Sequence, residues 1–398
     1  MTVLAVARVA ASRVSPPLST PADVAAAAAA LEREGRDVLR LEVGEPDFAT
    51  PAHVVEAGVA AMRDGRTRYA PPAGIPELRA AVAGHVAARG VSADASRVVV
   101  APGAKLLLGC VLLAALRDGD EVLVPDPGYP AYASAARRAG ARAVPYRMDD
   151  ALDVAALAAL VGPRTRAIVL NSPHNPTGAM LDARTLAAIA GIAERHDLLV
   201  VSDEIYGRLS YDGAHASIAA LPGMAARTAL VDGFSKSHAM TGWRLAYGVL
   251  PPALVAPVTA LLADTASCTP PFVQHAGLAA LTGPDDEIAR RVAELRARRD
   301  ALVATLAGDG VTCAAPAGGL YVFPRLAALR EPGDEERLVR RLLDAEGIAC
   351  VPGTAFGTRG AGRLRLALTA PPPALRRAGE AVRRQATALR GAPRARAR

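Results

Sequence analysis

Five short apolar segments, each ending in a polar or glycine-rich turn, constrain the fold of this chain most strongly. They alternate with stretches typical of helices and read RVVVAPGAK, EVLVPDPGY, RAIVLNSPHNPTG, DLLVVSDEIY and TALVDGFSK. Strands this apolar are buried on both faces, and helices between them indicate parallel connections. The sequence therefore predicts an α/β fold with a mainly parallel sheet flanked by helices. In such sheets ligands bind beyond the carboxyl ends of the strands, where these polar turns fall.

A second group of elements follows the sheet segments. From about Asp285 the chain becomes a long arginine-rich helix, after which come the shorter segments GGLYVFP, GIACVPG and GRLRLALT. A chain of 398 residues is long enough to bury two cores. We therefore predict a large domain over 48–284 and a smaller α+β domain made of 1–47 together with 285–398.

The composition argues against several classes of protein. The longest wholly apolar run, 106–116, is far shorter than the roughly 20 residues of a membrane span, and Arg8 interrupts the apolar N-terminus, which makes it a poor secretory signal. We therefore expect a cytoplasmic protein. Four of the seven excess positive charges lie in the tail 390–398, which we expect to be solvated and disordered, so nucleic-acid binding is not indicated. The spacing of the cysteines and histidines predicts neither a metal site nor a disulfide framework.

Three strand-end segments carry polar groups suited to binding an anion or a ring. Gly103, Ala104 and Lys105 form a tight turn that opens an apolar helix, so backbone N–H groups and the helix dipole can hold phosphate. Asn175 directly follows a strand, where its amide could donate to an oxygen anion or simply belong to a turn. Asp203 ends another strand, and a buried carboxylate there needs a cationic partner unless it caps the next helix.

Lys236, in GFSKSHAMTGWRLAY, is the most informative candidate residue. An amine becomes a nucleophile near neutral pH only when burial and cations lower its pKa well below the usual value of ~10.4. Ser235 and Arg244 indicate that an anion such as phosphate lies beside it. Tyr206 could point its hydroxyl at the same ligand, and Tyr129 offers a ring face, although an isolated tyrosine is often core. A phosphorylated ring with a ring nitrogen, a phenolic oxygen and a carbonyl for Lys236 describes pyridoxal phosphate.

Nine segments extend this pattern across 41–368. In order they read LRLEVGEPDF, RYAPPAGIPELR, PGAK, PGYPAY, NSPHNPTG, SDEIY, FSKSHAMTGWR, PGTAFG and RLRLAL. With them the chain resembles the class I/II (aspartate aminotransferase-like) family of fold-type I pyridoxal phosphate-dependent aminotransferases. The resemblance is specific to the family and much less specific to the substrate.

The resemblance implies a catalytic set of Lys236, Asp203 and Tyr206. Lys236 would hold the cofactor through an imine bond and move the proton at the substrate Cα. Asp203 would keep the pyridine nitrogen protonated, which makes the ring an electron sink. Asn175 and Tyr206 would hydrogen-bond the ring oxygen, and Tyr129 would stack on the ring.

The resemblance also implies how the cofactor phosphate is held. The backbone N–H groups of Ala104 and Lys105 would bind it together with the side chains of Ser235 and Arg244. Tyr69 matches the tyrosine that reaches the phosphate of the neighbouring subunit. The chain is therefore expected to form a homodimer with shared active sites.

The substrate contacts follow from the same resemblance. Arg365 matches the arginine that forks onto the substrate α-carboxylate, a planar pairing that lysine could not reproduce. Gly44 fits the position where the backbone approaches that carboxylate, and Asn175 completes the implied substrate-binding set.

Two positions depart from the pattern of the family. Gly233 stands where members often carry a hydroxyl, so one phosphate contact is either missing or made by Ser235 alone. Leu320 and Tyr321 follow a Gly-Gly pair where many relatives have two aromatic residues, which predicts a less aromatic pocket wall.

The main functional hypothesis is transamination between an L-α-amino acid and a 2-oxo acid. The same cofactor and fold also serve β- or γ-lyases, cyclising synthases and O₂-dependent oxidases, and the residues that would contact the cofactor do not separate these reactions. A third hypothesis, a cofactor-binding transcription regulator, needs a DNA-binding module. Only about forty residues precede GEPDF, and they contain no helix-turn-helix pattern.

Overall fold

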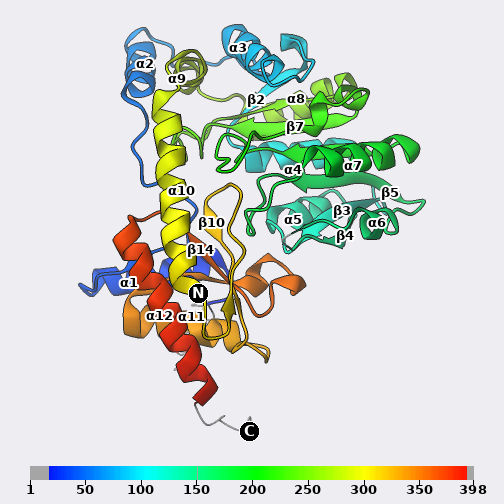
Figure 1. Ribbon diagram of the computed structural model, residues 1–398. Helices are drawn as coiled ribbons and strands as arrows, with labels where there is room; N and C mark the ends of the chain where they lie inside the picture. Colours follow the sequence, from blue (N-terminus) through cyan, green and yellow to red (C-terminus); the bar gives the residue numbers. More distant parts are fainter. Residues whose placement is uncertain (1–17, 150, 392–398) are drawn as a thin grey trace, which may run out of the picture.

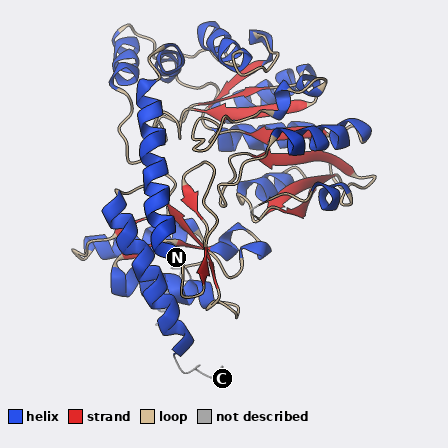
Figure 2. Ribbon diagram, viewed as in Figure 1, coloured by secondary structure: helices blue, strands red, loops and turns tan. Residues whose placement is uncertain are grey.

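The apolar segments form one seven-stranded sheet in the computed structural model, which describes residues 18–149 and 151–391 (Figure 2). The strand order is β2-β8-β7-β6-β5-β3-β4. Strand β8 is antiparallel to both of its neighbours, whereas β7, β6, β5, β3 and β4 run parallel. The predicted, mainly parallel sheet is therefore confirmed. Its strands are β2 (Val98–Ala101), β3 (Glu121–Asp126), β4 (Arg142–Arg147), β5 (Thr165–Asn171), β6 (Leu199–Asp203), β7 (Thr228–Gly233) and β8 (Ala246–Val249).

Strands β4 and β8 lie outside the five segments that the sequence predicts. Strand β4 is the edge of the sheet, and most of its residues are exposed or half-buried, so its apolar signal is weak. Strand β8 follows β7 through 234–245, a connection that contains no helix. A parallel neighbour is usually reached through a crossover helix, so the absence of a helix from 234–245 agrees with the antiparallel return of β8.

Helices cover both faces of the sheet (Figure 1). One face packs against α4 (Ala104–Ala115), α5 (Ala131–Arg138) and α8 (Pro252–Ala266). The other face packs against α2 (Ala52–Arg63), α3 (Pro76–Ala87), α6 (Val154–Ala158), α7 (Ala183–Arg195) and α9 (Pro271–Thr282). Alternate strand residues supply the two cores: Val201 and Val231 face α4, while Val200 and Leu230 face the opposite layer.

The long helix α10 (Asp286–Leu306) links the sheet to a second group of elements (Figure 1). One buried cluster there combines residues from both ends of the chain, including Leu41, Leu302 and Leu366. The domain boundaries predicted at 47/48 and 284/285 remain a prediction. Tyr206, which belongs to the predicted large domain, also contributes to this cluster. The remaining elements are α1 (Pro21–Arg33), β1 (Leu39–Arg40), β9 (Val311–Thr312), β10 (Tyr321–Val322), β11 (Arg325–Leu326), α11 (Asp334–Glu346), β12 (Ile348–Ala349), β13 (Val351–Pro352), β14 (Leu364–Ala367) and α12 (Pro372–Gly391).

Helix α1 begins with a capping box. The Thr20 hydroxyl accepts the Asp23 backbone N–H at 3.2 Å, and the Asp23 carboxylate accepts the Thr20 N–H at 2.9 Å. This cap fixes the first turn of α1, which borders the cavity described below. No helix within the described residues is long and apolar enough to cross a membrane. Most of the tail expected to be disordered, 392–398, lies outside the described residues.

Candidate active site

A cavity of about 800 Å³ opens at the carboxyl edge of the sheet, against the second group of elements. All but one of the predicted site residues line it. Its walls include Gly44, Ala104, Lys105, Tyr129, Asn175, Asp203, Tyr206, Ser235, Lys236, Arg244 and Arg365. The exception is Tyr69, whose side chain is 88% exposed and lies outside this cavity. A residue that serves a neighbouring subunit would be exposed in a single chain.

Lys236 follows β7 and reaches across the cavity. Its Nζ donates a hydrogen bond to the Gly44 carbonyl oxygen at 2.7 Å. Burial lowers the pKa of Lys236; the cations Arg365 and Arg244 lower it further, whereas Tyr321 and Glu45 act in the opposite direction. A buried amine with a lowered pKa is suited to nucleophilic chemistry. The chain has only two lysines, Lys105 and Lys236, and both line this cavity.

Asp203 ends β6 with its carboxylate buried. One carboxylate oxygen accepts the Tyr132 hydroxyl at 2.6 Å, and the other accepts the Ile205 backbone N–H at 3.3 Å. Burial raises the pKa of Asp203 to about 6, although the Tyr132 hydrogen bond acts to lower it. No ion pair joins Asp203 to a cation among the described residues. The buried carboxylate could therefore pair with a cationic group of a ligand.

We predict that Asp203→Asn stabilises the cofactor-free protein at alkaline pH. A carboxyl group whose pKa rises on folding from about 3.8 to about 6 opposes folding when ionised, and this cost fades as the pH falls through 6. The variant should gain about 3 kcal/mol at pH 8 and roughly half of that at pH 5. Urea unfolding of both cofactor-free proteins at the two pH values measures the difference. A variant less stable than the wild type at pH 8 would contradict the assigned burial cost.

Two asparagines connect the ends of β5 and β6 to Arg365. The Asn171 side chain donates to the Asp203 backbone oxygen at 2.9 Å and accepts the Asn175 N–H at 2.8 Å. Asn175 Oδ1 in turn accepts one Arg365 Nη at 3.2 Å, and the other Arg365 Nη donates to the Glu42 carbonyl oxygen at 2.7 Å. The buried Nε of Arg365 makes no hydrogen bond within the described residues. A guanidinium held in this way at the cavity wall is suited to binding a carboxylate.

Gly103 and Arg244 form an anion cradle at the start of α4. Gly103 has φ +101°, and a Cβ at this position would lie 2.2 Å from an Arg244 Nη atom. The guanidinium therefore lies against the glycine, beside the unpaired N–H groups of the first helical turn. Arg244 also donates to the Thr241 carbonyl oxygen at 2.8 Å, which fixes its orientation, and Ser235 also lines the cavity. This arrangement fits a phosphate.

Gly233 is required by packing. A Cβ there would lie 2.9 Å from the Cα and Cβ atoms of Ala246 on β8 and 3.0 Å from the Leu245 carbonyl oxygen. A hydroxyl-bearing residue would therefore force β7 and β8 apart. Ser235 is the nearby hydroxyl that lines the cavity.

Several residues of the cavity wall are not among those predicted from the sequence. Tyr132 lies within the quoted segment PGYPAY, three residues after Tyr129 on the same turn, which was an available signal. Leu320 points into the core, whereas Tyr321 lines the cavity together with Phe356. The guanidinium carbon of Arg365 lies 4.1 Å from the Tyr321 ring centroid and 4.5 Å from that of Phe356. This wall is therefore aromatic, with its second ring supplied by another segment.

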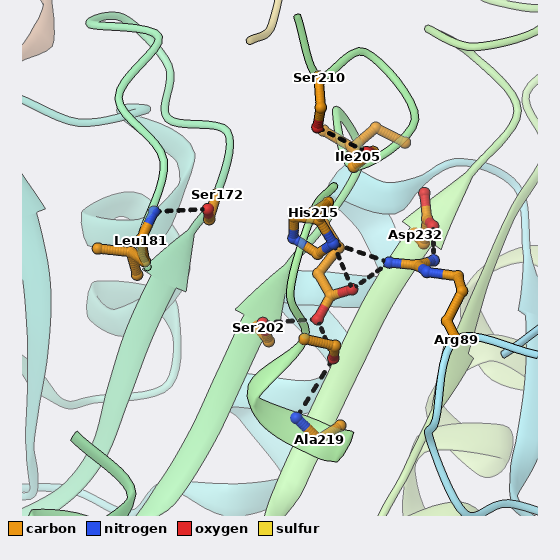
Figure 3. A network of polar contacts seen from close by, with 12 residues as sticks. Arg89, Ser172, Leu181, Ser202, Ile205, Ser210, His215, Ala219 and Asp232 are labelled. Atoms are coloured by element: carbon orange, nitrogen blue, oxygen red, sulfur yellow. Dashed lines mark hydrogen bonds and ion pairs between the residues drawn. The ribbon is translucent and has the colours of Figure 1, made fainter. Parts of the chain in front are cut away.

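A buried ionic cluster lies behind the site, on the other face of the sheet. The Arg89 guanidinium donates to Glu204 at 2.6 Å and to Asp232 at 3.1 Å, and it lies 3.1 Å from His215 Nδ1. Figure 3 shows Arg89 directed between His215 and Asp232. Burial and the adjacent Arg89 lower the pKa of His215 to about 4, so its ring is neutral at pH 7. Glu204 follows Asp203 directly, so the cluster ties together the ends of β6 and β7.

We predict that Arg89→Met destabilises the protein by about 3–5 kcal/mol, because it leaves two buried carboxylates without their cation. The matched control is Arg142→Met, which removes a guanidinium from Glu121 at the sheet edge, where the Arg142 side chain is 63% exposed. Its cost should be much smaller, because an exposed ion pair is screened by solvent and Glu121 keeps Arg164 as a partner. Urea unfolding measures both variants. Equal losses would show that the buried cluster is no more important than a surface ion pair.

Comparison with known proteins places this geometry in a class. The family described as aminotransferase class I and II matches residues 36–382. Arginine–pyruvate transaminase AruH of Pseudomonas aeruginosa is 40% identical, over 87% of this chain and 89% of its own. An aspartate aminotransferase of Musicola paradisiaca is 37% identical, over 84% and 86%. The solved structure of Thermus thermophilus aspartate aminotransferase with maleate superposes with a TM-score of 0.86 at 37% identity, covering 92% of this chain and 96% of that one.

The fold and the site therefore define a pyridoxal phosphate-dependent transferase. The chain belongs to the aminotransferase class I and II family and is an aminotransferase that acts on amino acids and 2-oxo acids. The residues present fit its cofactor: the Arg244–Gly103 cradle suits the phosphate, and the buried Asp203 carboxylate suits a protonated ring nitrogen. The relatives are named transaminases or aminotransferases, which gives no support to the lyase, synthase or oxidase alternatives.

Proposed function

We propose that transamination takes place in this cavity with the residue roles predicted above. The observation that carries the proposal is the convergence of Lys236, Asp203 and Arg365, from three distant segments, on one cavity of about 800 Å³. When bound, pyridoxal phosphate supplies a carbonyl for the amino group and a ring that accepts electrons from the substrate Cα.

Each side chain would have a separate role that follows from its position in the cavity. Arg365, held by Asn175 and the Glu42 carbonyl oxygen, binds and orients the α-carboxylate. Lys236 Nζ, 2.7 Å from the Gly44 oxygen, is then placed to move a proton to or from the substrate Cα. Asp203 would hold the proton on the cofactor ring nitrogen, and Tyr129 would cover the ring.

Single-turnover reactions test this function. Holoenzyme mixed with one amino acid and no 2-oxo acid should release up to one equivalent of the matching 2-oxo acid per site and no ammonia. Ammonia release with continued turnover would favour a lyase or an oxidase instead. The names of the relatives suggest arginine and aspartate as donors and pyruvate as an acceptor, and 2-oxoglutarate is the second acceptor of the panel. An aromatic amino acid completes it, because an aromatic aminotransferase of Pyrococcus horikoshii is a structural neighbour.

We further propose a cytoplasmic homodimer with shared active sites. The exposed Tyr69 supports it, together with the partly exposed apolar side chains of Met62 and Leu113. Measurement of the molar mass in solution tests the assembly. A monomer with full activity would remove the role assigned to Tyr69.

A further inference from the structure

Tyr321 lies where the predicted cofactor-binding and carboxylate-binding groups meet. Strand β10 carries it beside β14, the strand of Arg365. Its hydroxyl oxygen is 3.1 Å from that of Tyr206, and the two rings meet edge to face at 5.9 Å between centroids. Its ring also lies under the Arg365 guanidinium, with 4.1 Å between the centroid and Cζ. One buried side chain therefore contacts both halves of the site.

The backbone around Gly44 holds the Tyr321 hydroxyl in place. A Cβ at Gly44 would lie 1.7 Å from the Tyr321 hydroxyl oxygen, so the hydroxyl fills the space that any other residue would occupy. The carbonyl oxygen of the same glycine accepts the hydrogen bond from Lys236. Tyr321 thus packs against Gly44, the residue whose carbonyl oxygen accepts the Lys236 hydrogen bond.

The groups around the two phenols shift their pKa values in opposite directions. Burial acts to raise the pKa of Tyr321, but the cations Arg365 and Lys236, together with the hydrogen bond to Tyr206, bring it below its usual value. Burial and the neighbouring Tyr321 raise the pKa of Tyr206. Either hydroxyl can donate across this 3.1 Å contact, and Tyr321 is the donor when Tyr206 gives its own proton to the cofactor ring oxygen. The other charged groups facing the pair and the lysine are Asp203, Glu45 and Arg244.

We propose that Tyr321 is a positioning residue of the active site, which directs the Tyr206 hydroxyl proton toward the cofactor ring oxygen and couples that contact to Arg365. The proposal rests on the roles proposed above for Tyr206, Arg365 and Lys236. A hydroxyl that accepts one hydrogen bond is a stronger donor in the next. Tyr206 therefore stabilises a negative ring oxygen better when Tyr321 is present, and the cofactor-linked Lys236 nitrogen loses its proton at a lower pH.

Binding of a carboxylate at Arg365 should act through the same contact. The anion neutralises the guanidinium that makes Tyr321 acidic, so Tyr321 donates less strongly and the Lys236 nitrogen keeps its proton to higher pH. Asn175 also contacts Arg365, so part of this response remains without Tyr321.

The test is a pH titration of the visible absorption of the holoenzyme, without substrate, in the wild type and in Tyr321→Phe. The variant keeps the ring under Arg365 and loses only the hydroxyl. In Tyr321→Phe we expect the midpoint of the absorption titration to lie about 0.5–1 pH unit above that of the wild type. Saturating propionate should raise the midpoint further in both proteins, but by less in the variant than in the wild type. Tyr146→Phe is the matched control, since it removes a buried hydroxyl that donates to the Val169 carbonyl oxygen at 2.8 Å, away from the cavity lining, and it should titrate like the wild type.

A double-mutant cycle separates coupling from general disturbance. Because Tyr321 acts through Tyr206, Tyr321→Phe should shift the midpoint no further in a Tyr206→Phe background. An unchanged or lowered midpoint in Tyr321→Phe, or additive shifts in the cycle, would overturn the proposal. A wild-type holoenzyme that shows no lysine-linked absorption at any pH would instead contradict the proposed role of Lys236.

Discussion

Lys236→Ala should lose at least about 10⁴-fold of the transamination rate while the protein remains folded. The Nζ atom is the amine that the structure brings into the cavity with its pKa lowered, and no other described side chain can take over both its bond to the cofactor and its proton transfer. Lys105 is the one other lysine in the chain. Steady-state rates with the best donor and acceptor pair measure the loss, and circular dichroism checks the fold.

Two further measurements separate chemistry from damage to the site. Lys236→Arg keeps the positive charge but cannot form the bond to the cofactor, so it should be as inactive as the alanine variant. Methylamine should restore part of the rate to Lys236→Ala, where a cavity is left, and none to Lys236→Arg. Borohydride reduction of the wild type followed by peptide mapping should tag Lys236 and leave Lys105 unmodified. A tag on Lys105, or near wild-type turnover in either variant, would refute the assignment.

The strand-end part of the site was predictable from the sequence because two simple rules act together. Apolar runs predict buried parallel strands, and the carboxyl ends of parallel strands meet at one edge. Asn175, Asp203 and Lys236 each follow such a run, and the structure brings all three to the same cavity. The glycine turn before α4 is similar, since a positive φ at Gly103 and a helix start are both local properties.

The rest of the site depends on contacts that no local pattern specifies. Strand alternation places Glu204 on the face opposite to Asp203, but its partner Arg89 lies 115 residues away in the sequence. Tyr321 and Phe356 reach the cavity only because the second group of elements packs against the edge of the sheet. In the sequence Tyr321 stands out only as a departure from the family pattern, whereas its contacts with Tyr206 and Arg365 place it between two predicted groups.

Arg365→Lys should lower kcat/KM for amino acids by about 10²–10³-fold, mainly through KM. The guanidinium is buried against two rings and held by Asn175 and the Glu42 carbonyl oxygen, so it meets a carboxylate without reorganisation. A lysine ammonium cannot reproduce this planar fork, and the loss of a buried charge-assisted pairing costs about 2–4 kcal/mol. Because the carboxylate is bound in both the ground state and the transition state, the loss falls mainly on KM.

A substrate without an α-carboxylate shows whether Arg365 acts by binding that group. The wild type should react slowly with the primary amine that corresponds to its best amino acid, and Arg365→Lys should react with that amine at the same rate. The ratio of kcat/KM for the amino acid to kcat/KM for the amine should therefore fall sharply in the variant. The surface control Arg142→Lys, at the far edge of the sheet, should keep the wild-type ratio. If Arg365→Lys loses activity toward the amine as severely as toward the amino acid, Arg365 supports the architecture of the cavity and does not recognise the carboxylate.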